Sequence, residues 1–307
     1  MKILFNKIVY KIKNLRFVKI FERIFVATLF KNFARVIDNL KGISKLKRND
    51  IDVKNFYNSN LLEFFDINLE KLDFDVEQFV NTQKESELYK SRDGKQNIRK
   101  TWNLFPVGPI YEKNKDKIDK IRYLIENDKK FQEISKNHFN NKLRLTEISV
   151  FLNYPPKELD NYDKSNSKSS NYYSEGFHSD RLTIDTSRIF ISLRKIGENN
   201  GPTEFLDRET SKKIIKNTIF VYKNLSTGSI GGGRVDKEIS KKDFKIHSLN
   251  GNKGTAVFWN PNLILHRGNR PKLDNERLIL SAVCQIYPYT LIPSLNHKKE
   301  KSFVLPA

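Results

Sequence analysis

Two histidines and one aspartate have the residue types and spacing of a metal site. His178 and Asp180 stand two residues apart in the segment FHSD, and His266 follows much later in LILHRG. Alternate residues of an extended strand point to the same side, so His178 and Asp180 can face one ion. A distant histidine would complete a set of two imidazoles and one carboxylate, which suits non-haem Fe(II) and leaves three coordination positions open. A His-x-Asp segment alone carries little information, because this chain has 36 acidic residues.

An arginine after His266 adds a second part to this candidate site. Arg277 follows His266 by eleven residues, past the polar turn GNRPKLDN, and begins the apolar run RLILSAV. We expect a hairpin that places the guanidinium on a strand next to His266. The planar fork of an arginine grips a carboxylate through two hydrogen bonds, as a dicarboxylate co-substrate of an iron enzyme requires. The alternative is a structural ion pair with Glu276 or Asp274.

The elements that must position these residues change in character near Arg144. Over residues 49–143 we predict mostly helices, because LLEFFDINLEKL, VEQFVNTQKESELYK and DKIDKIRYLIENDKKFQEISKNHF have helical spacing. The intervening KSRDGKQNIRKTWNLFPVGP is predicted to be a loop. Short β-rich segments separated by turns follow over residues 144–292. The sequence therefore predicts an α+β fold with a mainly β core, a barrel or sandwich, buttressed by the preceding helices.

The composition indicates a folded chain with a basic surplus near its N-terminus. Of 307 residues, 38% are hydrophobic and 12% aromatic, which is too much apolar material for a disordered protein. A single cysteine, Cys284, excludes a disulfide scaffold and a cysteine-based zinc cluster. The net charge is +20, and residues 1–50 hold thirteen Lys/Arg against three Asp/Glu. Such a surplus favours an anionic partner, or it belongs to a lysine-rich, solvated surface.

Residues 1–40 have the pattern of a basic amphipathic helix that ends before Gly42. Apolar positions such as Phe5, Ile8 and Ile12 recur three to four residues apart, with lysines between them. The longest uncharged apolar run, IFVATLF, is too short to cross a bilayer, and no secretory signal is visible. Such a helix lies on an anionic membrane or packs against its own domain. We expect a cytoplasmic protein, with peripheral membrane contact through this segment left open.

The ordered motifs resemble those of the phytanoyl-CoA dioxygenase family. HSD, then NGPTEFLD, then GTAVFWNPNLILHRGNRP and finally ER follow that family's order over about residues 144–290. The resemblance implies a double-stranded β-helix, or jelly roll, and an Fe(II)- and 2-oxoglutarate-dependent oxygenase. It implies that His178, Asp180 and His266 are the catalytic metal ligands and that Arg277 binds 2-oxoglutarate. Relatives that halogenate lack the carboxylate at the position of Asp180, so the resemblance implies hydroxylation or desaturation rather than halogenation.

The expected organisation is a basic amphipathic helical segment at 1–48 and one oxygenase domain at 49–307. Within this domain we expect a helical buttress at 49–143, the jelly-roll core at 144–292 and a basic tail at 293–307. The implied reaction uses O2 to hydroxylate a C–H bond of a small-molecule or lipid- or glycan-linked substrate, with an anionic substrate left open.

Other functions stay open at this point. A degenerate jelly roll would make the chain a non-catalytic, basic membrane-surface binding protein. A cupin-like metal isomerase or epimerase would share the three ligands but would not need Arg277. No nucleic-acid partner is expected, because no platform of aromatic and basic residues is visible. Arg181, Arg194, Lys195 and Arg234 are candidates for contacting an acidic substrate group, from their positions alone.

Overall fold

A computed structural model describes most of the segment between residues 36 and 286. The described residues are 36–83, 87–90, 97–106, 108–155, 176–180, 182–217, 230–231, 239 and 244–286. Residues 36–48 are helical, and the helices after them are α3 (Val53–Asn58), η1 (Leu69–Lys71), α4 (Val76–Asn81), α5 (Pro109–Glu126), α6 (Lys129–Phe139), η2 (Glu198–Asn200) and α8 (Arg208–Asn217). The strands are β1 (Leu62–Asp66), β2 (Glu87–Lys90), β3 (Asn97–Phe105), β4 (Leu143–Asn153), β5 (His178–Ser179), β6 (Ser187–Ser192), β7 (Thr203–Leu206), β8 (Ile230–Gly231), β9 (Ile246–Ser248), β10 (Thr255–Trp259), β11 (His266–Gly268) and β12 (Arg277–Ile286).

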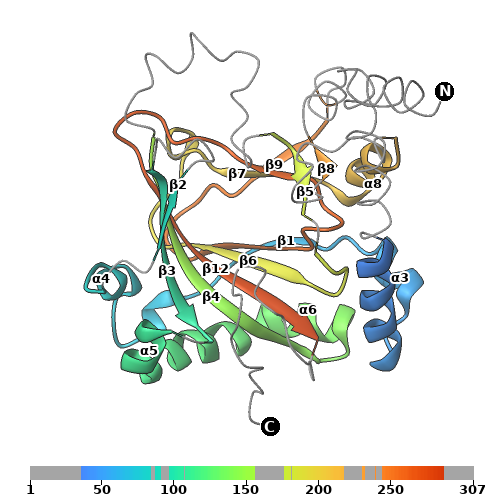
Figure 1. Cartoon of the computed structure of the whole chain (residues 1–307), viewed down its shortest axis with the longest axis horizontal. Helices are drawn as coiled ribbons and strands as arrows, with labels where there is room; N and C mark the ends of the chain where they lie inside the picture. The colour runs from blue at the N-terminus through green and yellow to red at the C-terminus, as the bar shows by residue number, and fades with distance from the viewer. Residues whose placement is uncertain are drawn as a thin grey trace, which may run out of the picture.

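Two antiparallel sheets lie face to face (Figure 1). The major sheet has the strand order β1-β10-β6-β12-β4-β3-β2, and the minor sheet has the order β8-β5-β11-β7-β9. From β4 to β7 each strand lies in the sheet opposite to its predecessor, and the same alternation links β9, β10, β11 and β12. This crossing between sheets is the double-stranded β-helix, so the predicted jelly roll is confirmed.

Apolar side chains fill both faces of the major sheet. On the outer face, Ile121 of α5 and Phe131 of α6 pack in one cluster with Leu280 of β12, as the position of these helices in Figure 1 indicates. Between the sheets, Trp259 and Phe205 belong to a second cluster that joins the major and minor sheets. The metal-site residues that the sequence predicts therefore lie around the inner cluster, and the helices support the major sheet from outside.

The sequence predicts a helical buttress over residues 49–143, but three strands, β1, β2 and β3, lie in this stretch. The prediction of helices or a loop is wrong for these three segments. The segment LLEFFDINLEKL forms β1 and η1, β2 occupies the end of a predicted helix, and β3 replaces the predicted loop. Phe64 of β1 lies opposite Val257, and Trp102 of β3 lies opposite Val150. Pairing with strands distant in sequence overrides the local pattern. The predicted helices α5 and α6 and the predicted strands β4, β6, β10 and β12 are present.

The helix over residues 36–48 packs against its own domain and continues through Gly42, where the sequence predicts an end. Leu46 is fully buried in the outer core cluster, and Lys45 binds Asp185 with an Nζ–Oδ2 distance of 3.1 Å. Residues 1–35, which carry most of the predicted basic helix, lie outside the described residues.

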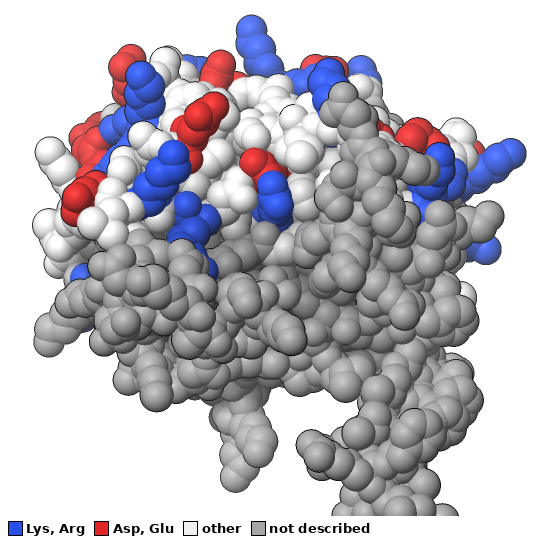
Figure 2. All heavy atoms as spheres, turned by 90° about the horizontal axis from the view of Figure 1, so that it is seen from above, with Lys and Arg blue, Asp and Glu red and all other residues white. Residues whose placement is uncertain are grey.

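The described surface does not carry the basic surplus as one patch on the face seen in Figure 2. Lys and Arg are interspersed there with Asp and Glu. Among the described residues, no helix has the length and apolar character needed to cross a membrane.

Candidate metal centre

The structure brings His178, Asp180 and His266 together between the sheets. The two histidines lie opposite each other in the register of β5 and β11, and Asp180 directly follows β5. The Nε2 atom of His178 lies 3.7 Å from Oδ1 of Asp180, and Nε2 of His266 lies 3.8 Å from Oδ2 of Asp180. Within the described ranges, no other group of three His, Cys, Asp or Glu residues converges in this way.

Backbone carbonyls orient both imidazole rings. Nδ1 of His178 lies 2.8 Å from the carbonyl oxygen of Gly176, and Nδ1 of His266 lies 3.0 Å from that of Ile264. Because a carbonyl oxygen only accepts, each Nδ1 donates its proton and each Nε2 keeps its lone pair. The Asp180 backbone N–H donates to the carbonyl of Pro261 at 2.8 Å, which holds the carboxylate beside both rings. This is the arrangement in which histidines present Nε2 to a metal ion.

Burial favours the neutral form of His266. Desolvation lowers the pKa of His266, although the charge of Asp180 and the hydrogen bond to Ile264 raise it, and the positive charge of Arg188 lowers it further. A metal ion binds neutral imidazole, so a lowered pKa removes proton competition at neutral pH.

Aromatic side chains enclose the centre. The ring centroid of Trp259 lies 5.7 Å from that of His266, and Phe205 lies 6.4 Å from the same ring. Phe190 of β6 contacts Trp259 edge to face at 4.6 Å. These rings keep water away from one side of the three candidate ligands and lower the local dielectric constant.

Arg277 faces the same space from the other sheet. β11 and β12 belong to different sheets, so the predicted hairpin between them is wrong. The Arg277 side chain lies on the face of β12 that also presents Ile279 to the inner cluster. Its guanidinium donates to the backbone carbonyls of Gly201 and, at 3.2 Å, Asn269. The alternative of an ion pair with Glu276 or Asp274 is not borne out: no ion pair joins Arg277 to either carboxylate, and Glu276 binds Arg194.

Arg194 is one of the four basic residues proposed from position to contact substrate, and the structure gives it a structural role. Arg194 binds Glu77 and Glu276, with N–O distances of 2.6 and 2.9 Å. Lys195 is exposed, while Arg181 and Arg234 lie outside the described residues.

A second arginine, which the sequence analysis missed, lies beside Arg277. Arg99 of β3 and Arg277 of β12 both pair with Asn153 of β4, so the three side chains share one face of the sheet. Burial and the positive charge of Arg99 lower the pKa of Arg277 to about 10, which leaves Arg277 protonated at neutral pH. The sequence predicts a loop around Arg99, and the weak alternation in NIRKTWNLF is the signal that indicates a strand.

Several buried polar atoms in the same space lack a hydrogen-bond partner. They are Nε of Arg277, Oγ of Ser192, Oγ1 of Thr203 and Nε1 of Trp259. Ser192 lies opposite Ile279, and Thr203 is two residues before Phe205, so both face the inner cluster. Leaving such a group unsatisfied costs about 1–3 kcal/mol. A hydrogen-bonding ligand between the sheets could satisfy these four atoms.

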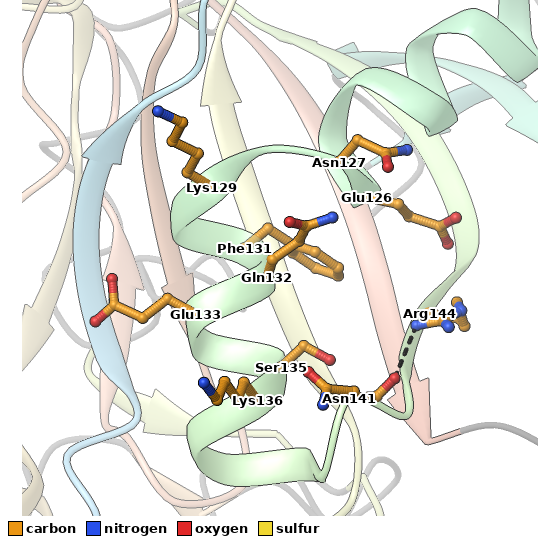
Figure 3. Close-up of a pocket in the computed structure, with 10 residues that line it drawn as sticks. All are labelled: Glu126, Asn127, Lys129, Phe131, Gln132, Glu133, Ser135, Lys136, Asn141 and Arg144. Carbon is orange, nitrogen blue, oxygen red and sulfur yellow. Dashed lines mark hydrogen bonds between the residues drawn. The ribbon is translucent and has the colours of Figure 1, made fainter.

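A groove of about 690 Å³ lies away from this centre, on the helical side of the major sheet (Figure 3). It is lined by the end of α5, by α6 and by the start of β4. Arg144 donates to the Asn141 carbonyl at 3.1 Å, and Glu126 accepts from the Leu145 backbone at 2.8 Å. These two charged groups are thus used locally, and the groove holds none of the predicted site residues.

Comparison with known proteins identifies the fold. No protein-family model matches the chain, and no curated protein is similar to it in sequence. Among solved structures, the epimerase SnoN in complex with Fe3+, α-ketoglutarate and nogalamycin RO matches with a TM-score of 0.51 and 12% identity, over 86% of this chain and 96% of that one. The non-heme α-ketoglutarate-dependent carbocyclase SnoK from nogalamycin biosynthesis matches with a TM-score of 0.50 and 10% identity, over 80% of this chain and 88% of that one. The chain therefore has the double-stranded β-helix fold of α-ketoglutarate-dependent enzymes.

Proposed function

We propose that the protein is an Fe(II)- and 2-oxoglutarate-dependent oxygenase related to the phytanoyl-CoA dioxygenases, which hydroxylates a C–H bond of a small molecule. The observation that carries the proposal is the convergence of His178, Asp180 and His266 on one point, with Nε2 of both rings facing the carboxylate. Two imidazoles and one carboxylate are the donor set that suits non-haem Fe(II) with open positions.

The arginine pair fits the co-substrate. Arg277 and Arg99 place two positive charges on one row of the major sheet, where no carboxylate among the described residues pairs with Arg277. We assign Arg277, with Arg99, to the far carboxylate of 2-oxoglutarate, whose oxygens would also satisfy nearby buried donors such as Ser192 and Thr203. A metal isomerase without a dicarboxylate co-substrate would leave this pair unexplained.

The chain's own residues hold the metal ligands in position and keep water away from them. When bound, iron and 2-oxoglutarate supply the activation of O2 that breaks an unreactive C–H bond. The carbonyls of Gly176 and Ile264 fix the two histidines, and Trp259 and Phe205 shield them. The two fold relatives are an epimerase and a carbocyclase, so product analysis decides whether oxidation here ends in hydroxylation, desaturation or ring closure.

Anaerobic Fe(II) titration with and without 2-oxoglutarate tests the proposal. We expect a visible charge-transfer band only when both are present, and loss of this band and of 2-oxoglutarate turnover in Asp180→Ala and His178→Ala. The matched control is His247→Ala, because His247 of β9 stacks on Phe64 outside the triad and its loss should leave the band intact.

A folded wild-type chain without the band, or an Asp180→Ala variant with full 2-oxoglutarate turnover, would exclude the oxygenase. The basic surface-binding protein would then be the leading function.

A further inference from the structure

One arginine near the metal centre has no part in the assignments above. Arg188 lies in β6, opposite Trp259 of β10 and Val283 of β12. Trp259 packs in the inner cluster, and so does Phe190, which lies two residues after Arg188 on β6. Residues that face each other across a sheet or alternate along a strand share one side, so Arg188 points between the sheets. It is partly exposed, and a solute can therefore reach it.

Arg188 lies on the metal side of the barrel, away from Arg277. Arg188 lies opposite Trp259, whose ring centroid is 5.7 Å from that of His266, whereas Arg277 lies in one register row with Asn153 and Arg99. Along β12, Val283 and Arg277 are six residues apart. At roughly 3.3 Å per residue, this corresponds to about 20 Å of strand. Arg188 is thus placed to serve a different acidic group from the one assigned to Arg277.

No described residue neutralises the guanidinium of Arg188. Its Nε atom is buried without a hydrogen-bond partner, and no ion pair or hydrogen bond joins it to any described residue. Glu147 of β4 lies in the same register row, beyond Val283, but forms no ion pair with it. A partly desolvated charge without a partner lowers the stability of the protein. A planar guanidinium offsets this loss best when it binds a carboxylate or phosphate through two hydrogen bonds.

We propose that Arg188 binds an acidic group of the substrate, so that this site selects a small organic acid or phosphate ester. The inference rests on the proposed oxygenase function and specifies its substrate class.

Calorimetry on the full chain, loaded with Ni(II) as a redox-inert metal and with 2-oxoglutarate, tests this inference. The probes are hexanoate, hexyl phosphate and the neutral hexanamide. We expect at least one acid to bind the wild type tenfold or more tightly than hexanamide, and the better acid distinguishes a carboxylate from a phosphate group. Arg188→Gln should reduce the preference to less than twofold, and Arg188→Lys should keep part of it. Affinity for 2-oxoglutarate should change by less than twofold in both.

Glu147→Gln is the matched control and should keep the preference for the acid. Equal binding of acids and amide by the wild type, an undiminished preference in Arg188→Gln, or equal losses in Arg188→Gln and Glu147→Gln would overturn the inference. A tenfold loss of 2-oxoglutarate affinity in Arg188→Gln would do the same. Failure of the wild type to bind Ni(II) and 2-oxoglutarate would instead count against the proposed function. The acid titrations are therefore repeated on the metal-free chain and judged there by the same outcomes.

Discussion

At the scale of single residues, short backbone contacts orient the two histidines of the candidate metal centre. Each histidine donates Nδ1–H to the carbonyl oxygen two residues before it, Gly176 for His178 and Ile264 for His266. A contact that close in sequence fixes the ring as soon as the strand forms. The tautomer that a metal ion requires is therefore set locally, while the meeting of the rings depends on the pairing of β5 with β11.

Replacing Arg277 should weaken 2-oxoglutarate binding. Hydrogen bonds to a charged group are worth about 1.5–3 kcal/mol, so Arg277→Gln should lower the affinity roughly ten- to a hundredfold, and Arg277→Lys by less. Anaerobic titration of the Fe(II)-loaded protein measures this. Arg194→Gln removes an arginine that binds Glu77 and Glu276, and should leave the affinity unchanged. Equal effects of Arg194→Gln and Arg277→Gln would contradict the assignment.

Acid should destabilise the fold partly through His138. Burial lowers the pKa of His138, although Glu63 raises it, and Lys130 lowers it further. The unfolded chain then binds a proton more readily below a pH of about 6.5, so stability is retained above that pH and falls as the pH drops through the lowered pKa. Urea unfolding at pH 7 and pH 5 should show a smaller loss in His138→Gln than in the wild type. An identical loss in both proteins would argue against this role.

At the scale of elements, the helix over residues 36–48 supports the segment that follows Asp180. Asn262 donates to the carbonyl of Leu182 at 2.5 Å and to Asn39 of the helix at 3.2 Å. Asn260 donates to the carbonyl of Ile184 at 2.6 Å, and Lys45 of the helix binds Asp185. The helix, the turn after Asp180 and the turn after β10 therefore form one connected unit beside the candidate metal centre.

Gly42 lets this helix approach closely, and Gly42→Ala should destabilise the protein. A Cβ atom there would lie 2.7 Å from Cγ2 of Ile184 and 3.0 Å from its backbone nitrogen. Overpacking costs about 1–3 kcal/mol, which exceeds the gain of up to about 1 kcal/mol from alanine's helix propensity. Urea unfolding measures the difference. Gly197→Ala is the control, because the nearest atom to its Cβ would be 3.8 Å away. A more stable Gly42→Ala protein would show that the contact relaxes freely.

At the scale of the whole molecule, the outer core seals the single cysteine. Cys284 of β12 is fully buried in the cluster beneath the helices, and burial raises the pKa of its thiol. A protonated, inaccessible thiol is a poor nucleophile. We expect no reaction with Ellman's reagent in the native protein and one thiol per chain after unfolding in urea. Rapid stoichiometric labelling without urea would mean that the core opens readily.

Sequence alone determined the residues that can do chemistry and the strands with strong patterns. Residue type and spacing single out four candidates, His178, Asp180, His266 and Arg277. Whether a side chain can bind a metal ion or a carboxylate depends on its own chemical groups, which the sequence gives directly. Strands such as β4, β6 and β12 are rich in β-forming apolar residues, a feature that is local. These segments predict a barrel or sandwich, and the resemblance of the ordered motifs to the phytanoyl-CoA dioxygenase family implies the jelly roll.

Only the tertiary structure decided which side chains share a space. β1 and β3 form because they pair with β10 and β4, although their own residues favour a helix or a loop. The same pairing places Arg99 beside Arg277 and turns Arg188 inward, and the crossing between sheets brings β12 across from β11. The physical reason is register: which residues meet across a sheet depends on hydrogen bonds between strands far apart in the chain, and no local pattern contains that information.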